Sequence, residues 1–269
     1  MQVIPRLRRL LRRFLVELRL EYLRARLQAA KPGAVVKLDG VALHITDGLN
    51  AYMQYKDEVV RRIYDFEPDR GDPVVIDGGA NMGAFTIATR RRHARARIVA
   101  FEPDPAIAAI LRENLGRNGI EGVRVVEAAL GGVPGTATFA PDGESGGALT
   151  AAGSATVRVE VLSAWLGEEV DFVKLNIEGA ELDVLREAAS AGRLRNIKAL
   201  VVEYHGWPRA PQRLHDVLAV LDANGFRYVV HDFDEQTNPV TKPPFRDPGD
   251  APWFALVAAW RVARPATQP

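Results

Sequence analysis

From Pro73 onward the sequence alternates short apolar runs with longer amphipathic stretches, and this alternation is the strongest constraint on its fold. Parallel strands must be joined by crossovers, usually helices, so the pattern favours a parallel sheet covered by helices. The expected strands are 74–77, 98–102, 123–127, 171–176, 198–204, 226–231 and 253–261, and the expected helices lie near 83–93, 104–118, 179–191 and 210–224. We therefore expect one α/β domain over residues 73–263, followed by a short tail at 264–269.

An insertion at 131–160 separates the third and fourth expected strands and is rich in Gly, Ala, Ser and Thr. Two pieces of it, "GTATFA" and "ATVRVEVL", have the composition of strands. Its glycine-rich part at 142–154 has two interpretations: a mobile lid over a bound molecule, or a slack surface loop.

Residues 1–72 form a leading region before this domain. The stretch "AVVKLDGVALHI" (34–45) places Asp39-Gly40 between two alternating runs, which predicts a β-hairpin. A helical stretch follows at about 51–65, and nothing in it suggests catalysis.

The start of the chain is strongly basic. Residues 1–31 carry eight arginines and one lysine against two glutamates, a net charge of +7, whereas the whole chain carries +1. The remainder is therefore acidic, which argues against a body that binds nucleic acid. Apolar residues recur here at helical spacing: Leu7, Leu10, Leu11, Phe14, Leu15, Leu18 and Tyr22.

Two interpretations of this amphipathic helix remain open. It packs on the body or on a second subunit, or it lies on an anionic membrane surface with its arginines near lipid phosphates. Its uncharged runs, such as Phe14–Val16, are far too short for a membrane span or a signal peptide. We expect a cytoplasmic protein, attached peripherally to a membrane in the second interpretation.

Residue types exclude several kinds of site. The chain has no cysteine, so disulfides, thiolate nucleophiles and cysteine-based zinc sites are excluded. Its five histidines form no ligand pair at helical spacing, and we expect no metal site. His44, His93, His215 and His231 are expected to be surface or core histidines.

The stretch "VVIDGGANMGAFTI" (74–87) is an apolar strand, a loop running from Gly78 through Gly79, Ala80, Asn81 and Met82 to Gly83, and an apolar helix start. Glycines let the backbone approach a ligand closely, and the helix N-terminus offers free N–H groups. Dinucleotide-binding enzymes share this design, so the loop alone does not identify the ligand.

Two acidic residues end the first two strands, and Asp77 separates the alternatives. Asp77 ends the first strand, where a carboxylate could accept a hydrogen bond from a ligand's ammonium group but would not help to bind a pyrophosphate. This position therefore favours S-adenosylmethionine over NAD. Glu102 ends the second strand, nineteen residues after Gly83, where it can accept both ribose hydroxyls of either ligand. Pro103 and the residues after it start the next helix. The alternative role for Glu102 is that of a helix-start acid.

The third strand ends in Glu127, Ala128 and Ala129, where small side chains leave room for a flat adenine; packing of sheet against helix explains both alanines equally well. The candidate cofactor contacts are Asp77, Gly78, Gly79, Ala80, Asn81, Gly83, Glu102, Pro103, Glu127 and Ala128.

Four stretches in order resemble the FkbM-type family of S-adenosylmethionine-dependent methyltransferases: "VVIDGGANMGAFTI", "VAFEPDPAIAAILRENLGRNG", "DFVKLNIEGAELDVLREA" and "ALVVEYH". The resemblance covers about Pro73 to His205. It implies a Rossmann-like class I methyltransferase fold, with a seven-stranded, mostly parallel sheet and a reversed last strand. It also implies methyl transfer, usually to a hydroxyl oxygen of a sugar, glycan, glycolipid or natural product.

The fourth strand ends in polar residues on the side where an acceptor would sit. Lys174 and Asn176 share one face of the strand, and Glu178 follows at the turn. Asn176 is the expected positioning group near the methyl, although the family pattern usually has Asp there; the change puts metal dependence and activity in question. Burying an unpaired ammonium is costly, so we predict that Lys174 pairs with a carboxylate.

Methyl transfer to oxygen needs a base for the hydroxyl proton. The candidates are His205, Glu178 and Lys174 with a depressed pKa, and His205 is slightly favoured because a carboxylate such as Glu203 can orient it. Glu178 and Glu181 also have a structural interpretation, as carboxylates at a helix start. Trp207, Trp253 and Phe254 line a sugar-binding wall or serve as core and loop anchors.

Three functions follow from these patterns. The leading one is an O-methyltransferase that acts on a small-molecule or glycan acceptor. A non-catalytic protein that keeps the cofactor pocket and binds a partner or membrane through its basic helix is the second, and Asn176 motivates it. An NAD-dependent oxidoreductase is the third.

Overall fold

The computed structural model describes residues 3–140, 147–149, 153–208, 210–232 and 252–261, and of residues 3–10, 12, 13, 148 and 149 the backbone only. Its main sheet has seven strands in the order β12-β13-β11-β10-β3-β4-β5. Their bounds are β3 Val74–Gly78, β4 Arg97–Phe101, β5 Arg124–Val126, β10 Val170–Leu175, β11 Ile197–Gly206, β12 Phe226–His231 and β13 Trp253–Arg261.

The direction of the strands confirms the predicted topology. Strands β5, β4, β3, β10 and β11 run parallel to one another, whereas β13 runs antiparallel to both β11 and β12. The reversed last strand therefore lies inside the sheet, between its neighbours. All seven expected strands form: β12 and β13 have the expected bounds, and the bounds of the other strands shift by at most two residues.

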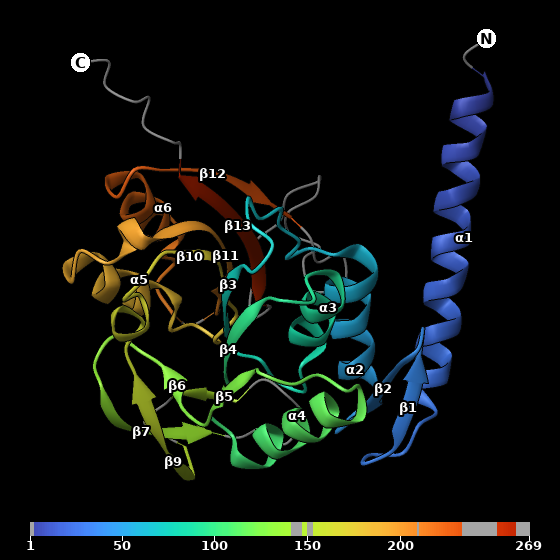
Figure 1. Ribbon diagram of the computed structural model, residues 1–269, viewed down its shortest axis with the longest axis horizontal. Helices are drawn as coiled ribbons and strands as arrows, with labels where there is room; N and C mark the ends of the chain where they lie inside the picture. Colours follow the sequence, from blue (N-terminus) through green and yellow to red (C-terminus); the bar gives the residue numbers. More distant parts are fainter. Residues whose placement is uncertain (1–2, 141–146, 150–152, 209, 233–251, 262–269) are drawn as a thin grey trace.

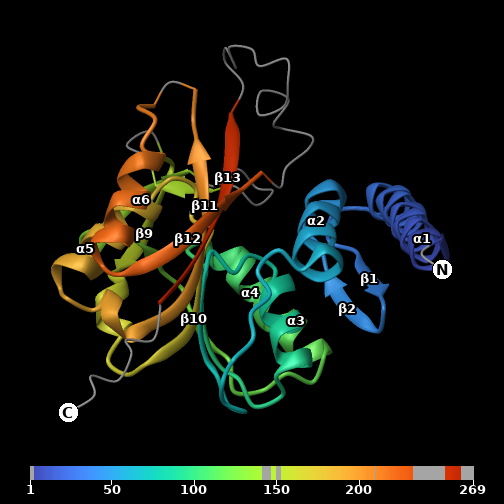
Figure 2. The same ribbon diagram turned by 90° about the horizontal axis from the view of Figure 1, so that it is seen from above.

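Helices cover both faces of this sheet (Figure 2). On one face lie α3 (Ala84–Arg92) and α4 (Pro105–Arg117), and on the other lie α5 (Glu181–Ser190) and α6 (Leu214–Ala223). The strands read as apolar runs because both of their faces are buried: every residue of β3 and β10 is buried. The carboxyl ends of the parallel strands β3, β4, β10 and β11 lie at one edge of the sheet.

The insertion forms a second, four-stranded sheet in the order β6-β9-β7-β8 (Figure 1). Its strands are β6 Ala129–Leu130, β7 Gly135–Ala140, β8 Ala148–Leu149 and β9 Ala155–Glu160. Both pieces expected to be strands form, as β7 and β9. The lid proposed for 142–154 lies largely outside the described residues.

The leading region contains the predicted hairpin. Strands β1 (Val35–Leu38) and β2 (Val41–His44) pair antiparallel, and the turn places Asp39 and Gly40 at φ 49° and 79°, as a tight hairpin requires. The hairpin is fixed to α4, because the Asn114 side chain accepts the His44 backbone N–H at 2.6 Å.

The helix expected at 51–65 begins and ends at earlier residues of the sequence. Helix α2 (Gly48–Gln54) begins with Asp47 as its N-cap and continues into a π-helical segment, η1 (Tyr55–Arg61). Residues after it pack into the main domain: the Phe66 ring stacks on Phe172 of β10 at 4.4 Å. The leading region thus shares the core of the sheet.

Helix α1 (Val3–Gln28) lies at the edge of the molecule beside α2 and the hairpin (Figures 1 and 2). Leu20, Leu23 and Leu27 are its buried apolar residues. No helix within the described ranges is both long enough and apolar enough to cross a bilayer.

Candidate active site

The loop after β3 has the conformation that its glycines predict. Gly79 and Gly83 adopt φ 77° and 94°, and Asn81 between them is also left-handed at 49°. A Cβ on Gly79 would lie 1.8 Å from the backbone oxygen of Asn176, which makes glycine necessary there. The loop after β3 therefore touches the loop after β10, while Ala80 is buried beneath it.

Asp77 and Lys174 form a buried ion pair under this loop. The Lys174 Nζ lies 3.0 Å from Oδ1 of Asp77, and Thr86 donates its hydroxyl to the other carboxylate oxygen at 2.6 Å. The predicted Lys174–carboxylate pair is confirmed. Burial lowers the pKa of Lys174, but the carboxylates of Asp77 and Glu58 outweigh it and leave the pKa raised. Lys174 is therefore charged, and the depressed pKa that a lysine base needs is absent.

Glu102 follows β4 and lies against the glycine loop. It accepts backbone N–H groups from Asn81 at 2.9 Å and from Asp104 at 3.0 Å, and only 6% of its surface is exposed. Burial raises its pKa to about 7. Pro103 lies between Glu102 and Asp104, and Asp104 is the N-cap of α4. Glu102 thus touches the helix start and the glycine loop together.

The residues after β5 have other contacts than the glycine loop and Glu102. The Glu127 side chain is exposed and pairs with Arg112 of α4. Ala128 is fully buried in the core beneath the sheet, as the packing interpretation expects.

Asn176 extends from the end of β10 toward two polar groups of other segments. Its Nδ2 donates to Oε2 of Glu203 at 3.2 Å and lies 3.5 Å from the Tyr64 hydroxyl, which also donates to Glu203. The Oδ1 atom of Asn176 is buried and has no hydrogen-bond partner among the residues that the structure describes. Buried acceptors of this kind are rare, so a donor from a bound molecule would satisfy it.

His205, near the end of β11, is clamped between two carboxylates. Its Nδ1 lies 2.9 Å from Oε1 of Glu181, and its Nε2 lies 3.4 Å from Oε2 of Glu178. Burial alone lowers the pKa of His205, but the two carboxylates raise it well above its ordinary value. His205 is therefore an imidazolium at neutral pH. The carboxylates at its ring are thus Glu181 and Glu178, whereas Glu203 bonds to Tyr64 and Asn176.

The two acids at the start of α5 have structural contacts as well. Glu181 accepts the backbone N–H groups of Ile177 and Gly179 at 3.1 and 3.2 Å. Glu178 adopts a left-handed backbone at φ 56°, which is unusual for a residue other than glycine. Such strain is concentrated at functional sites, where the surroundings hold it in place.

Aromatic rings surround His205. Trp207 stacks on the imidazole with ring centres 5.6 Å apart, and Phe254 of β13 meets it edge-on at 5.2 Å. Trp253 lies apart from this pair, against Tyr204 at 5.3 Å. The structure therefore brings two of the three aromatic candidates to the site and uses the third in packing.

Two residues of the leading region join the site without having been predicted. Tyr64 is buried and bonds to Glu203, and Glu58 of η1 is a buried carboxyl that interacts electrostatically with Lys174, Asp77 and Glu203. Burial raises the pKa of Glu58 to about 8. The available signal was the pair of acidic residues Asp57 and Glu58 within the expected helix at 51–65.

The remaining histidines lie elsewhere. His44 pairs with Glu113 at 2.6 Å, His93 lies against the Phe66 ring, and His215 and His231 are exposed. Among the residues that the structure describes, no three His, Cys, Asp or Glu side chains are grouped to hold a metal ion.

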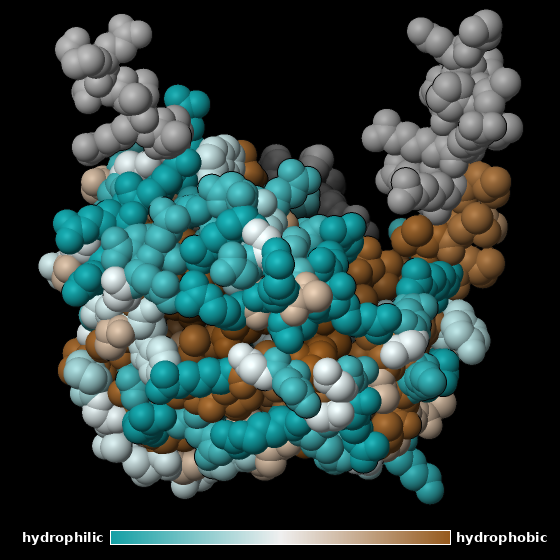
Figure 3. Space-filling view, in the orientation of Figure 1, coloured by the Kyte–Doolittle hydropathy of each residue, from teal (hydrophilic) through white to brown (hydrophobic). Residues whose placement is uncertain are grey.

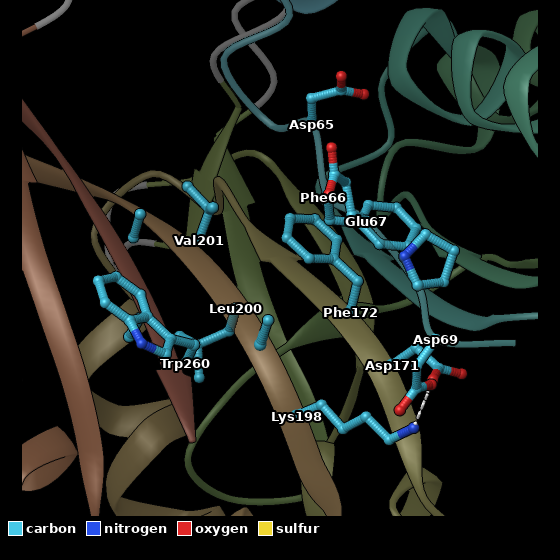
Figure 4. Close-up of a pocket in the computed structure, with 14 residues that line it drawn as sticks. Asp65, Phe66, Glu67, Asp69, Asp171, Phe172, Lys198, Leu200, Val201 and Trp260 are labelled. Atoms are coloured by element: carbon cyan, nitrogen blue, oxygen red, sulfur yellow. Dashed lines mark hydrogen bonds and ion pairs between the residues drawn. The ribbon is translucent and has the colours of Figure 1, made fainter. Parts of the chain in front are cut away.

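A cavity of about 300 Å³ lies outside the site (Figure 4). Its wall contains Phe66, Phe172, Trp260 and the ion pair between Lys198 and Asp171 at 3.0 Å. Asp171 and Lys198 are the second residues of β10 and β11, so this cavity is near the amino ends of the strands. Ligands of doubly wound sheets bind at the carboxyl ends, where Asn176 and His205 lie.

Comparison with protein families gives one match that spans most of the main domain. The profile described as "Methyltransferase FkbM domain" matches residues 77–228, more than half of the chain. The matched range begins at Asp77 and includes Glu102, Asn176, Glu178 and His205.

The chain also resembles individual methyltransferases at low sequence identity. "Methyltransferase 1" of Beauveria bassiana is 27% identical over 161 residues, which are 49% of this chain and 65% of that protein. "Methyltransferase sdnD" of Sordaria araneosa is 27% identical over 192 residues, covering 56% and 74%. "2-O-methyltransferase NoeI" of Sinorhizobium fredii is 26% identical over 161 residues, covering 51% and 65%.

Solved structures share the fold at low sequence identity. TYW2 of M. jannaschii, in complex with AdoMet, superposes with a TM-score of 0.50 at 15% identity, covering 87% of this chain and 89% of that one. The human methyltransferase 10 domain containing protein also gives 0.50, at 13% identity, with 91% and 97% covered. These likenesses support the Rossmann-like α/β fold.

Proposed function

The chain belongs to the FkbM family of methyltransferases, and we propose that it moves a methyl group from S-adenosylmethionine to a hydroxyl oxygen of an acceptor. The observation that carries the proposal is a convergence at one edge of the sheet. Glu102 and the glycine loop follow β4 and β3, while Asn176 and the His205 cluster follow β10 and β11. A cofactor half and an acceptor half thus adjoin at the edge where doubly wound sheets bind ligands.

The residues present fit this cofactor. Glu102 is held by two backbone N–H groups and keeps lone pairs for ribose hydroxyls. Beneath the loop, Asp77, Glu58 and Glu203 surround the one ammonium of Lys174. Glu58, with a pKa of about 8, is largely protonated at neutral pH. A nearby positive charge lowers the pKa of such carboxyl groups and a negative one raises it, so they favour a cationic ligand over a pyrophosphate. Asp77 would act on the cofactor through its negative charge, because Lys174 and Thr86 already engage both of its oxygens.

When bound, S-adenosylmethionine supplies an electrophilic methyl group on its sulfonium. The chain's own residues must then hold the acceptor hydroxyl and take its proton. Asn176 is suited to holding it: its amide nitrogen is fixed by Glu203, and its Oδ1 has no partner in the described part of the chain.

Glu178 is the group best placed to take the proton. His205 is already protonated, so its ring nitrogens lack a free lone pair at neutral pH. Glu178 has a side chain 21% exposed, against 2% for both His205 and Glu181. The His205 imidazolium then positions Glu178, and Glu181 fixes the ring from its other side.

The acceptor class rests on relatives as well as on the site. The relative NoeI is named a 2-O-methyltransferase. The Trp207 and Phe254 rings beside Glu178 and His205 supply the apolar faces that sugars pack against. A sugar, glycan or natural-product hydroxyl is therefore the proposed acceptor. The chain spans 65% of the length of two of its relatives, so the substrate of the whole protein is part of the proposal.

The proposal is tested by methyl transfer with purified protein. S-Adenosylmethionine with a tritiated methyl group is incubated with a panel of mono- and oligosaccharides and hydroxylated natural products. Glu178→Gln should lower kcat about 10²-fold or more while cofactor affinity stays unchanged. Glu168→Gln, which alters a carboxylate far more exposed, at 60%, is the matched control. Unchanged kcat in Glu178→Gln would remove Glu178 from the role of base.

A cofactor-binding protein without turnover is the second candidate, and Asn176 favours it because the family pattern usually has Asp there. It predicts S-adenosylmethionine binding with no labelled product over the whole panel. Asn176→Asp that raises turnover would argue against it. An NAD enzyme would instead show a melting temperature raised by NAD and unaffected by S-adenosylmethionine.

A further inference from the structure

Helix α1 carries two apolar faces, and the body uses one of them. Leu20, Leu23 and Leu27 are buried against the body. The other face is exposed and consists of Leu11, Phe14, Leu15, Leu18 and Tyr22, which we call the outer stripe. Residues two apart on a helix lie about 200° apart around its axis, so Leu18 and Leu20 point to opposite sides.

The outer stripe is long and strongly exposed. Its members have between 54% and 64% of their surface accessible, which is unusual for five large apolar side chains on one helical face. They repeat at i, i+3, i+4, i+7 and i+11, the spacing of one continuous helical face. Figure 3 shows apolar surface on the described part of α1 that stands away from the body.

The charge around the stripe identifies what can cover it. The first 31 residues hold eight arginines and one lysine against two glutamates. By helical position, Arg8, Arg12 and Arg19 fall along one border of the stripe, and Arg19 reaches Asp39 of the hairpin. A second copy of α1 would bring another basic segment against the first, and the two would repel. An anionic bilayer offers both an apolar interior and negative phosphates.

We propose that α1 docks the protein on the surface of an anionic lipid membrane, with the outer stripe inserted between headgroups and the arginines facing phosphates. Leu20, Leu23 and Leu27 stay on the body in this arrangement, so docking needs no unfolding of the chain. The inference goes beyond the proposed methyl transfer and does not depend on it, because the stripe contains no residue of the candidate active site.

The test is co-sedimentation of the full chain with vesicles. Vesicles of phosphatidylcholine with about 30% phosphatidylserine should bind the protein, and pure phosphatidylcholine vesicles should bind it at least tenfold more weakly. Leu15→Ser and Phe14→Ser should each weaken binding to anionic vesicles roughly tenfold. Val133→Ser, which alters an apolar residue of the body that is 76% exposed, should leave binding unchanged.

Three results would overturn the proposal. The first is no sedimentation of the unaltered chain with anionic vesicles. The second is equal binding by Leu15→Ser and Val133→Ser. The third is a dimer in light scattering that Leu15→Ser dissociates while vesicle binding stays unchanged, which would make the stripe an interface between copies. Circular dichroism and melting temperature confirm that each variant is folded, and cofactor binding serves as an independent readout of the methyltransferase site.

Discussion

Lys174 and Asp77 occupy paired positions on the neighbouring strands β10 and β3, and their charged groups meet 3.0 Å apart with both side chains buried. The Lys174 Nζ also donates to the backbone oxygen of Gly79 at 2.8 Å. One ammonium thus ties the end of the first strand, the glycine loop and the acceptor-side strand together. The arrangement joins the cofactor half of the site to the half that holds the acceptor.

Removing the ammonium should be strongly destabilising. Lys174→Met leaves Asp77 as a buried carboxylate without its partner, which should cost about 3–5 kcal/mol in the free energy of unfolding. The double variant Lys174→Met/Asp77→Asn removes the stranded charge and should recover at least half of that loss. Urea denaturation at pH 7 measures both. A single variant that loses less than about 1 kcal/mol would show that the pair is not buried as described.

The close approach of two loops at Gly79 gives a second prediction. Gly79→Ala places a Cβ 1.8 Å from the Asn176 backbone oxygen and also strains a positive φ. Gly119→Ala has a similar φ of 63° and no atom near its Cβ, so it measures the strain alone. We expect Gly79→Ala to lose at least about 2 kcal/mol more stability than Gly119→Ala. Equal losses in chemical denaturation would contradict the contact.

Glu58 should make stability depend on pH. Its folded pKa of about 8 exceeds the ordinary 4.5, so between these values the folded chain binds more protons than the unfolded one. Stability from this group therefore falls as pH rises from about 5 to 8, by up to a few kcal/mol. Glu58→Gln cannot lose a proton, so its melting temperature relative to the unaltered chain should rise over this range. Glu168→Gln, which alters a carboxylate that is 60% exposed, is the matched control.

His205 should also make stability fall as pH rises. Its folded pKa is raised well above 6.5, so the stability that the imidazolium contributes is full below pH 6.5 and is lost as pH rises through the folded pKa. The destabilisation caused by His205→Gln should therefore be larger at pH 6 than at pH 10. A cost that does not change with pH would mean that His205 is neutral in the folded chain.

The sheet and its helices were predictable because each element carries its own periodicity. Both faces of β3 and β10 are buried, and this produces the continuous apolar runs that mark parallel strands. The need for a partner at Lys174 also followed from sequence, since a buried ammonium cannot stand alone. Its identity as Asp77 followed only from the pairing of the two strands.

Contacts between distant segments were not predictable in the same way. Glu203 lies two residues from His205, which suggested that it orients the ring; Tyr64 and Asn176 engage Glu203 instead, and Glu181 contacts His205. Glu58 was missed because local sequence does not show that η1 packs over the site. For α1, the sequence shows an apolar stripe but not that the body uses the opposite face.

The most direct test of the cofactor site is calorimetric titration of the purified chain with S-adenosylmethionine. Glu102 accepts the backbone N–H groups of Asn81 and Asp104, and in this account it also holds the ribose hydroxyls. We predict binding by the unaltered chain, at least tenfold weaker binding by Glu102→Gln, and unchanged binding by Glu168→Gln. Equal affinities for all three proteins, or no binding by the unaltered chain, would contradict the central claim.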